Sequence, residues 1–200
     1  PVPILDNNKY DSAIVVGSGN AYNTGQIIFS DNATAITDQS NFRNRVARLV
    51  ESGSVKQAVI ISASGGKDSV WEVDEAKKKG LRTTLITTKG ESDAAKVADE
   101  TIVYKSAPEL YTYNFTTYFG MILSATRESP AAIKEFIQSV KLPENFGRYP
   151  RFAFVLPDQF AAVCPMLDIK KNELFGGIEA FRAFSEGDAR HAKFVIRDED

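Results

Sequence analysis

From residue 13 onward, short apolar runs alternate with longer segments that have the pattern of amphipathic helices. The runs have the length of β-strands and cover residues 13–17, 33–37, 58–62, 82–88 and 101–105. Strand-sized runs separated by helices predict parallel strands with helices on both faces of the sheet. The first three runs are rich in Val and Ile and show no polar alternation, as expected for strands buried on both sides.

The segments between the runs carry helix signals. The stretch QSNFRNRVARLVESG places its apolar residues at helical spacing and stops at Gly53. The stretch DSVWEVDEAKKKG begins with an acidic residue and ends in three lysines and a glycine, which matches the charge preference of helix ends. We therefore predict an α/β fold, a three-layer doubly wound parallel sheet, over residues 1–142.

Beyond this unit the composition changes. The stretch KLPENFGRYP concentrates Pro, Gly and polar residues, which is typical of a linker, and we place one over residues 143–151. Residues 152–200 open a second α/β unit that is too short for an independent domain of this kind. We expect it to be incomplete and to be completed by further chain or by a partner subunit. Its predicted elements are a strand at 151–157, a helix near 160–175, and strands near 179–184 and 192–196.

Composition argues against several classes of partner. The chain has 24 Lys and Arg against 26 Asp and Glu, a net charge of -2, and no long basic run, so nucleic acid is not expected to bind. The apolar stretches fall far short of the roughly 20 residues that cross a bilayer. No signal peptide opens the sequence, so we expect a cytoplasmic protein without membrane contact. With Cys164 the only cysteine and no cluster at metal-ligand spacing, neither a disulfide nor a metal is expected.

Glycine-rich turns follow the first and third runs, where doubly wound sheets bind their ligands. The first turn is GSGNAYNTG, with Ser18 and Gly19 near its start. In the turn after the third run, glycines let backbone amides approach an anion, and the helix expected to start near Asp68 aims its free N–H groups at the same point. Both turns are therefore places where a ligand is expected.

The third run ends in SASGGK, which supplies hydroxyls at Ser62 and Ser64, amides at Gly65 and Gly66, and a cation at Lys67. The stretch SGGKDS also fits the fingerprint of ATP pyrophosphatases, in which a comparable turn holds pyrophosphate. In those enzymes the loop follows the first strand of its domain, whereas two strands precede it here. A purely structural turn is the third alternative.

Residues 13–128 resemble the sugar isomerase (SIS) domain family. The stretch AVIISASGGKDSVWEVDEAKKKGLRTTLIT is similar to the family's strand, Ser-x-Ser-Gly turn, helix and strand, and DAAKVADETIVYKSAPE is similar to the segment that leads into its last strand. The nearest likeness is to the isomerase half of glucosamine-6-phosphate synthases, which GSGNAYNTG and QSNFRNR also resemble. The resemblance implies a flavodoxin-like sheet that binds a phosphosugar at both turns. Two positions depart from the pattern, because Ala21 and Lys67 replace hydroxyl residues.

The resemblance also implies residues for proton transfer in the second unit. Glu173, in KKNELFGG, resembles the carboxylate that acts as the base, and Lys170 matches a lysine three residues before it. His191, the only histidine, resembles a residue in a turn before a strand and would open the sugar ring. The alternatives are a solvated helix face for Glu173 and Lys170, and an ordinary loop histidine.

These features lead to one expected function and one alternative. We expect an aldose–ketose isomerase, deaminase or deglycase that acts on a hexose 6-phosphate without a cofactor. The resemblance implies a homodimer, and the aromatic segment LYTYNFTTYFGMILSATRE, residues 110–128, is a candidate interface. A non-catalytic phosphosugar sensor is the alternative.

Overall fold

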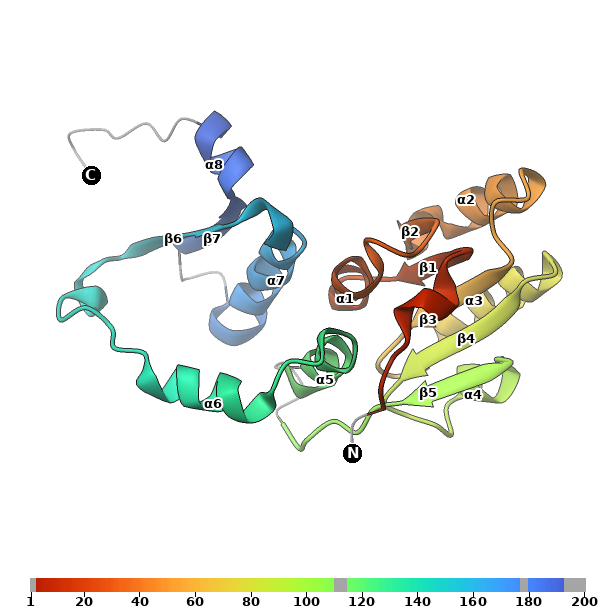
Figure 1. Ribbon diagram of the computed structural model, residues 1–200, viewed down its shortest axis with the longest axis horizontal. Coiled ribbons are helices and arrows are strands. Elements are labelled where there is room, and N and C mark those ends of the chain that lie inside the picture. The colour runs from red at the N-terminus through yellow and green to blue at the C-terminus, as the bar shows by residue number, and fades with distance from the viewer. Residues whose placement is uncertain (1–2, 110–114, 177–179, 193–200) are drawn as a thin grey trace. The chain divides into compact units, whose positions relative to one another are not determined.

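The structure is a computed structural model (Figure 1) that describes residues 3–109, 115–176 and 180–192. The chain divides into two compact units, Pro1–Ser139 and Val140–Asp200. Each unit is described by itself below.

The first unit is built on a parallel sheet of five strands, in the order β2-β1-β3-β4-β5. The strands are β1 (Ala13–Gly17), β2 (Ala35–Asp38), β3 (Gln57–Ile61), β4 (Arg82–Thr87) and β5 (Glu100–Val103). All four neighbouring pairs are parallel. The predicted doubly wound sheet is therefore confirmed. Its order reverses between β1 and β3, which is the switch point of a flavodoxin-like fold.

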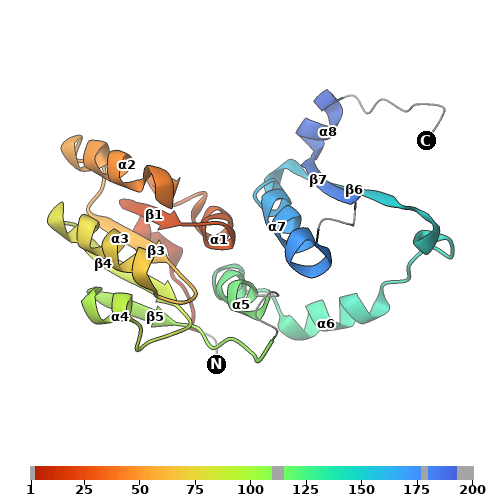
Figure 2. The same ribbon diagram turned by 180° about the vertical axis from the view of Figure 1, so that it is seen from behind.

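Helices cover both faces of this sheet (Figures 1 and 2). Three of them, α2 (Gln39–Glu51), α3 (Lys67–Lys78) and α4 (Asp93–Val97), pack on one face. On the other face lie α1 (Asn20–Phe29) and α5 (Phe115–Thr126). The result is the predicted three-layer arrangement.

Each central strand supplies two cores because neighbouring side chains point to opposite faces of a sheet. In β1, Ile14 and Val16 pack with Phe42 of α2 in one core. Val15 packs with Phe29 of α1 in the other core. All five residues of β1 are buried, which explains why the strand shows no polar alternation in sequence.

The aromatic segment 110–128, the candidate interface, corresponds in part to α5, while residues 110–114 lie outside the described residues. Met121 is buried against the sheet, and the Ser124 hydroxyl lies 2.9 Å from the Tyr104 hydroxyl. Phe115 and Phe119 are 51% and 38% exposed, so only one face of α5 belongs to the core. Helix α6 (Pro130–Ser139), which the sequence did not predict, follows and has no buried residue.

The second unit contains a parallel strand pair joined by a helix. Strand β6 (Arg151–Leu156) leads into α7 (Val163–Phe175), which returns to β7 (Ala180–Ser185). Helix α8 (Glu186–Ala192) comes next. The strand predicted near 192–196 begins on the last residue of α8, and its other residues lie outside the described part of the chain.

Three short 3-10 helices complete the elements of the described residues. They are η1 (Asn7–Tyr10) in the first unit, and η2 (Phe146–Arg148), which lies within the segment 143–151, and η3 (Asp158–Phe160) in the second.

Candidate functional site

The SASGG turn lies at the carboxyl end of β3, where the chain passes into α3. Three of its residues, Ser64, Gly65 and Gly66, line a hollow of about 500 Å³. The rest of the lining comes from the loop after β4: Lys89, Gly90, Glu91, Ser92 and Asp93. The hollow therefore sits at the carboxyl ends of two adjacent strands, where this type of sheet binds ligands.

The serines of the turn are bonded to its glycine amides. The Ser62 hydroxyl accepts a hydrogen bond from the Gly65 amide at 3.1 Å, and the Ser64 hydroxyl accepts one from the Gly66 amide at 3.3 Å. A hydroxyl that accepts can still donate its own proton. Of the two serines only Ser64 lines the hollow, so an anion there would meet the Ser64 hydroxyl as a donor that the Gly66 amide polarises.

Gly65 fixes the position of the turn. Its φ is +57°, in the left-handed region that glycine adopts without steric cost. A Cβ atom at this position would lie 2.0 Å from the Ser92 Oγ and 2.5 Å from the Ser92 Cβ. The Gly65 carbonyl accepts a hydrogen bond from the Ala94 amide at 3.2 Å. The turn is therefore packed directly against the start of α4, and only a glycine fits there.

Helix α3 begins beside the turn without a side-chain cap. Its N-cap is Gly66, and the hydroxyl of Ser69 donates to the Gly66 carbonyl at 2.7 Å. The amides of a first helical turn have no partner within the helix, so they are available to an external acceptor. Lys67, which the sequence suggested as the cation of the site, is exposed and is not one of the lining residues.

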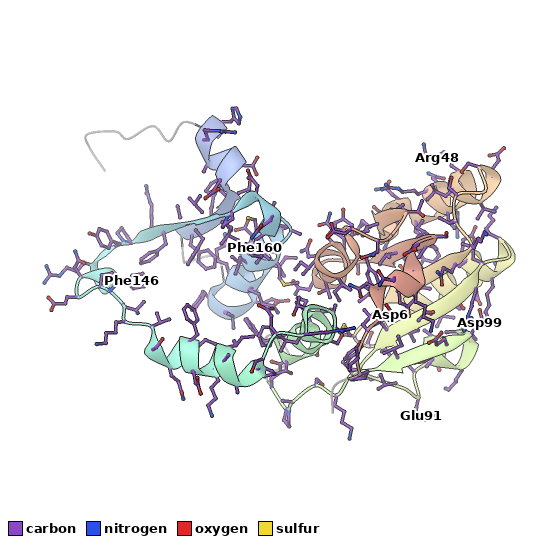
Figure 3. The ribbon with its side chains drawn as sticks, in the orientation of Figure 1. Asp6, Arg48, Glu91, Asp99, Phe146 and Phe160 are labelled. Atoms are coloured by element: carbon purple, nitrogen blue, oxygen red, sulfur yellow. The ribbon has the colours of Figure 1, made fainter. Side chains whose placement is uncertain are left out.

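The loop after β4 adds charges that the sequence analysis did not assign to the site. Lys89 is an exposed cation of the lining, and its amide donates to the Thr87 hydroxyl at 3.2 Å. Glu91, labelled in Figure 3, and Asp93 are the two carboxylates of the lining. The Lys96 ammonium lies 2.9 Å from the Asp93 carboxylate and partly neutralises it. The missed signal is positional, because this loop follows the strand adjacent to β3.

The chain resembles known proteins in its structure and not in its sequence. The sequence matches no protein-family model and no curated protein. The structure is similar to tagatose-6-phosphate ketose/aldose isomerase from Escherichia coli, with a TM-score of 0.67 and 16% identity, over 96% of this chain and 62% of that one. It is also similar to the C-terminal domain of glucosamine-fructose-6-phosphate aminotransferase from Francisella tularensis, with a TM-score of 0.61 and 16% identity, over 92% of this chain and 61% of that one.

The chain has the SIS fold. The fold that the sequence resemblance implied is thus confirmed. This chain spans less than two thirds of the length of each of these two solved structures.

The other predicted turn of the SIS fold, after β1, contributes to a different hollow. Ser18 lines a space of about 470 Å³ together with Asp38, Gln39, Ser40, Arg43, Asn44 and Trp71. Gly19 is the N-cap of α1, with a φ of 52° and no side-chain cap. Ala21, at the position of the hydroxyl in the family pattern, is buried. The structure therefore places Ser18 and Ser64 in separate hollows.

Glu72 is a buried acidic residue that the sequence analysis did not notice. It lies on α3 beside Val73, is 3% exposed, and forms no hydrogen bond with any described residue that the structure records. Burial, and to a smaller extent the carboxylates of Asp68 and Asp38, raises the pKa of Glu72 to about 8. The available signal was its spacing on α3, three residues after Ser69 and four before Ala76, both of which are buried, so Glu72 falls on the buried face.

The residues predicted for proton transfer lie in the second unit. On α7 the Lys170 ammonium lies 2.5 Å from the Glu173 carboxylate; Lys170 is 6% exposed and Glu173 is partly buried. His191 is exposed and lies in helix α8. His191 therefore lies in a helix and not in the predicted turn, while the strand predicted after it lies almost entirely outside the described residues.

Two kinds of feature are absent among the residues that the structure describes. No helix among them has the length and apolar character that a membrane span requires. No group of three or more His, Cys, Asp or Glu residues among them is arranged to hold a metal ion. Cys164 is a buried free thiol, and burial raises its pKa.

Proposed function

We propose that this protein is a cytoplasmic, homodimeric phosphosugar isomerase that binds a hexose 6-phosphate at the hollow between the turns after β3 and β4. One observation carries the proposal. Ser64, Gly65 and Gly66 line a hollow at the uncapped start of α3 and at the carboxyl ends of adjacent parallel strands. The SIS fold, shared with a ketose/aldose isomerase of a 6-phosphate sugar, supports the same class of ligand.

The phosphate would be held by neutral donors and by a positive charge. The Ser62 and Ser64 hydroxyls and the first amides of α3 provide the donors, and the helix dipole favours a dianion at this point. Lys89 supplies a cation within the lining, and Lys67 supplies another at its margin. The Glu91 carboxylate repels an anion, so we place the phosphate on the side of the hollow that the serines form. The hydroxyls of the sugar then point toward Glu91.

The isomerisation moves a proton between neighbouring carbons. In our proposal the Glu173 carboxylate takes the proton from C2 of the open-chain aldose while O1 gains one, which gives an enediol. The proton then returns to C1 as O2 loses its own, which gives the ketose. Lys170, bonded to Glu173, orients the carboxylate. His191 is assigned to opening of the sugar ring.

Binding and chemistry can be tested separately. Fructose 6-phosphate and glucose 6-phosphate should raise the unfolding temperature, whereas free fructose should not. In D2O the protein should exchange the C2 proton of glucose 6-phosphate, as followed by NMR. Ser64→Ala should weaken binding of fructose 6-phosphate about tenfold, since it removes a hydrogen bond to a charged group. Ser54→Ala, an exposed serine in the loop after α2, is the matched control.

The outcomes distinguish the alternatives. Equal stabilisation by fructose and by its 6-phosphate contradicts the phosphate site. If the protein binds the sugar phosphate without exchanging its proton, and Glu173→Gln leaves binding unchanged, the result favours the non-catalytic sensor. The observation that supports the sensor is the buried Ala21, which stands where the family pattern has a phosphate-binding hydroxyl. Release of pyrophosphate from ATP, abolished by Ser64→Ala, would support the ATP pyrophosphatase alternative.

A further inference from the structure

The turn after β1 has three glycines whose roles differ. A Cβ atom on Gly17 would lie 2.8 Å from the backbone of the first turn of α1, so the tight turn into the helix requires glycine. Gly19 has a φ of +52°, and a Cβ there would meet nothing within 4 Å, so its backbone is open to approach. A Cβ on Gly25 would lie 3.2 and 3.3 Å from side chains of β1 and β3, so this glycine lets α1 pack closely on the sheet.

These are the three roles that glycines perform in the dinucleotide-binding turn of doubly wound sheets: the tight turn, the approach of phosphate to backbone, and close packing of helix on strand. In that fingerprint the third glycine comes three residues after the second. Here that position is Tyr22, and the packing role falls to Gly25, one helical turn later. Helix α1 begins at Asn20, and its N-cap Gly19 provides no side-chain cap, which leaves the positive end of the helix for an anion.

A carboxylate stands at the end of the neighbouring strand. Asp38 is the last residue of β2, about 20 residues after the turn, where nucleotide-binding sheets carry the acidic residue that binds ribose hydroxyls. Its Oδ1 atom accepts a hydrogen bond from the Ser40 amide at 2.9 Å and so caps α2. The Oδ2 atom has no hydrogen-bond donor among the residues that the structure describes, so it can accept from a ligand.

Turn and carboxylate share one hollow. Ser18 and Asp38 both line the space of about 470 Å³ at the carboxyl ends of β1 and β2. This volume lies within the range of small-molecule sites, roughly 300–1,000 Å³. None of its lining residues lines the hollow assigned to the phosphosugar, so the two spaces are distinct.

Arg43 and Trp71, which also line the hollow, present flat groups on which a ring can stack. The guanidinium carbon of Arg43 lies 5.5 Å from the centre of the Trp71 ring, and the Arg43 side chain is 71% exposed. The Arg43 Nε atom is 3.7 Å from the Glu75 carboxylate, too far for a hydrogen bond. Guanidinium and indole planes are the groups on which nucleic-acid bases stack. Asn44 and Gln39 add amide groups that can donate and accept at a base edge.

The charges favour a hydroxyl-bearing ring over a phosphate at the floor of this hollow. Asp38 occupies the start of α2, so the anion site that a helix start would offer is already filled by a protein carboxylate. A carboxylate with a free oxygen is well suited to accept from vicinal hydroxyls, and it repels a phosphate. A ligand phosphate would instead point toward the open start of α1.

We infer that the hollow lined by Ser18, Asp38, Arg43 and Trp71 is a ribonucleotide site. Asp38 accepts hydrogen bonds from the ribose hydroxyls, the base lies against Arg43 and Trp71, and the phosphate approaches the backbone at Gly19. This assigns Ser18 and Gly19 to a second ligand and leaves the proposed phosphosugar hollow unchanged.

The test is isothermal titration calorimetry of the full chain with ADP and with its 2′,3′-dideoxy analogue. ADP should bind, and loss of the ribose hydroxyls should weaken binding about tenfold or more, because the Asp38 oxygen loses its donors. Asp38→Asn should lower the affinity for ADP to that for the dideoxy analogue. The variant should preserve the cap of α2, since Asn caps a helix as well as Asp does. Asp68→Asn, an exposed residue outside the lining, is the matched control.

The result is decisive in both directions. No heat of binding with ADP at millimolar concentration, or equal affinity for ADP and its dideoxy analogue, overturns the inference. The analogue comparison uses the unaltered protein, so it stands even if a variant fails to fold. Ser64→Ala should leave ADP binding unchanged. Loss of fructose 6-phosphate binding with retention of ADP binding therefore affects the proposed function alone.

Discussion

The two glycine-rich turns at the switch point of the sheet are alike in sequence and different in construction. Both carry a glycine with positive φ, and both lead into a helix without a side-chain cap. Gly65 is enclosed by Ser92, whereas the space around Gly19 is open to 4 Å from a Cβ position. The same sequence signal thus produces a turn locked by its neighbours after β3 and an accessible turn after β1.

The largest expected effect comes from Gly65→Ala. The added methyl would collide with Ser92, and its positive φ is unfavourable for alanine, costs of about 2 and 1–2 kcal/mol. We expect the free energy of unfolding to fall by about 3–4 kcal/mol, measured by urea denaturation. Binding of fructose 6-phosphate should also be lost, because the turn must move away from α4. A loss below about 1 kcal/mol would contradict the locked turn.

The next effect concerns Glu72, which lies on the helix that follows the locked turn and interacts with Asp38 of the other hollow. Its pKa is about 8 in the folded chain against 4.5 in a free carboxyl. The native state therefore binds more protons than the unfolded state between these values, so its stability falls as pH rises through this window. The free energy of unfolding falls by about 3 kcal/mol between pH 4.5 and pH 7.

Glu72→Gln removes this titration. The variant should be more stable than the parent by about 3 kcal/mol at pH 7 and nearly equal to it at pH 4.5, as measured by urea denaturation at the two pH values. Glu51→Gln, at the exposed end of α2, is the control and should show no such dependence. A Glu72→Gln advantage of the same size at both pH values would mean that the carboxyl is not held protonated by burial.

The smallest effect is expected for Gly19→Ala. Only the backbone conformation opposes alanine there, a φ of 52° combined with a ψ of -123°, which costs about 2 kcal/mol. Gly53→Ala is a close match, because Gly53 also has a positive φ and open space around it but lies after α2. Both variants should lose similar stability in thermal unfolding, while only Gly19→Ala should weaken ADP binding. A Gly19→Ala cost as large as that of Gly65→Ala would remove the distinction between the turns.

The strands were predictable because each central strand is buried on both faces, and a strand of this kind consists of an uninterrupted run of apolar residues. The bounds of β1 agree with the predicted run, and those of β3 and β4 differ from it by one residue. Helix α6 was missed although Ile133, Phe136 and Ile137 stand at helical spacing in its sequence. In the structure Phe136 and Ile137 are exposed, so this apolar stripe is not part of the core. The segment at His191 was misjudged because a resemblance in sequence letters was taken to carry a turn that the chain replaces with α8.

The site was predictable where it is local in sequence. The turn residues Ser62, Ser64 and Gly65 follow one strand and could be read together. Lys89 joins the same hollow from a loop more than twenty residues later, and only the pairing of β3 with β4 brings the two together. The hollow at Asp38 likewise combines residues from three elements, so it could not be predicted from any single stretch of the sequence.

The contact between Gly65 and Ser92 has a kinetic consequence. A turn held in place by α4 before any ligand arrives needs no ordering step during the encounter, and the entropy of fixing it has been lost already on folding. Capture of an anion at this turn should then proceed at the rate set by diffusion and orientation, with a single relaxation phase in stopped-flow mixing. Loosening the turn would show itself first as a second, slower phase.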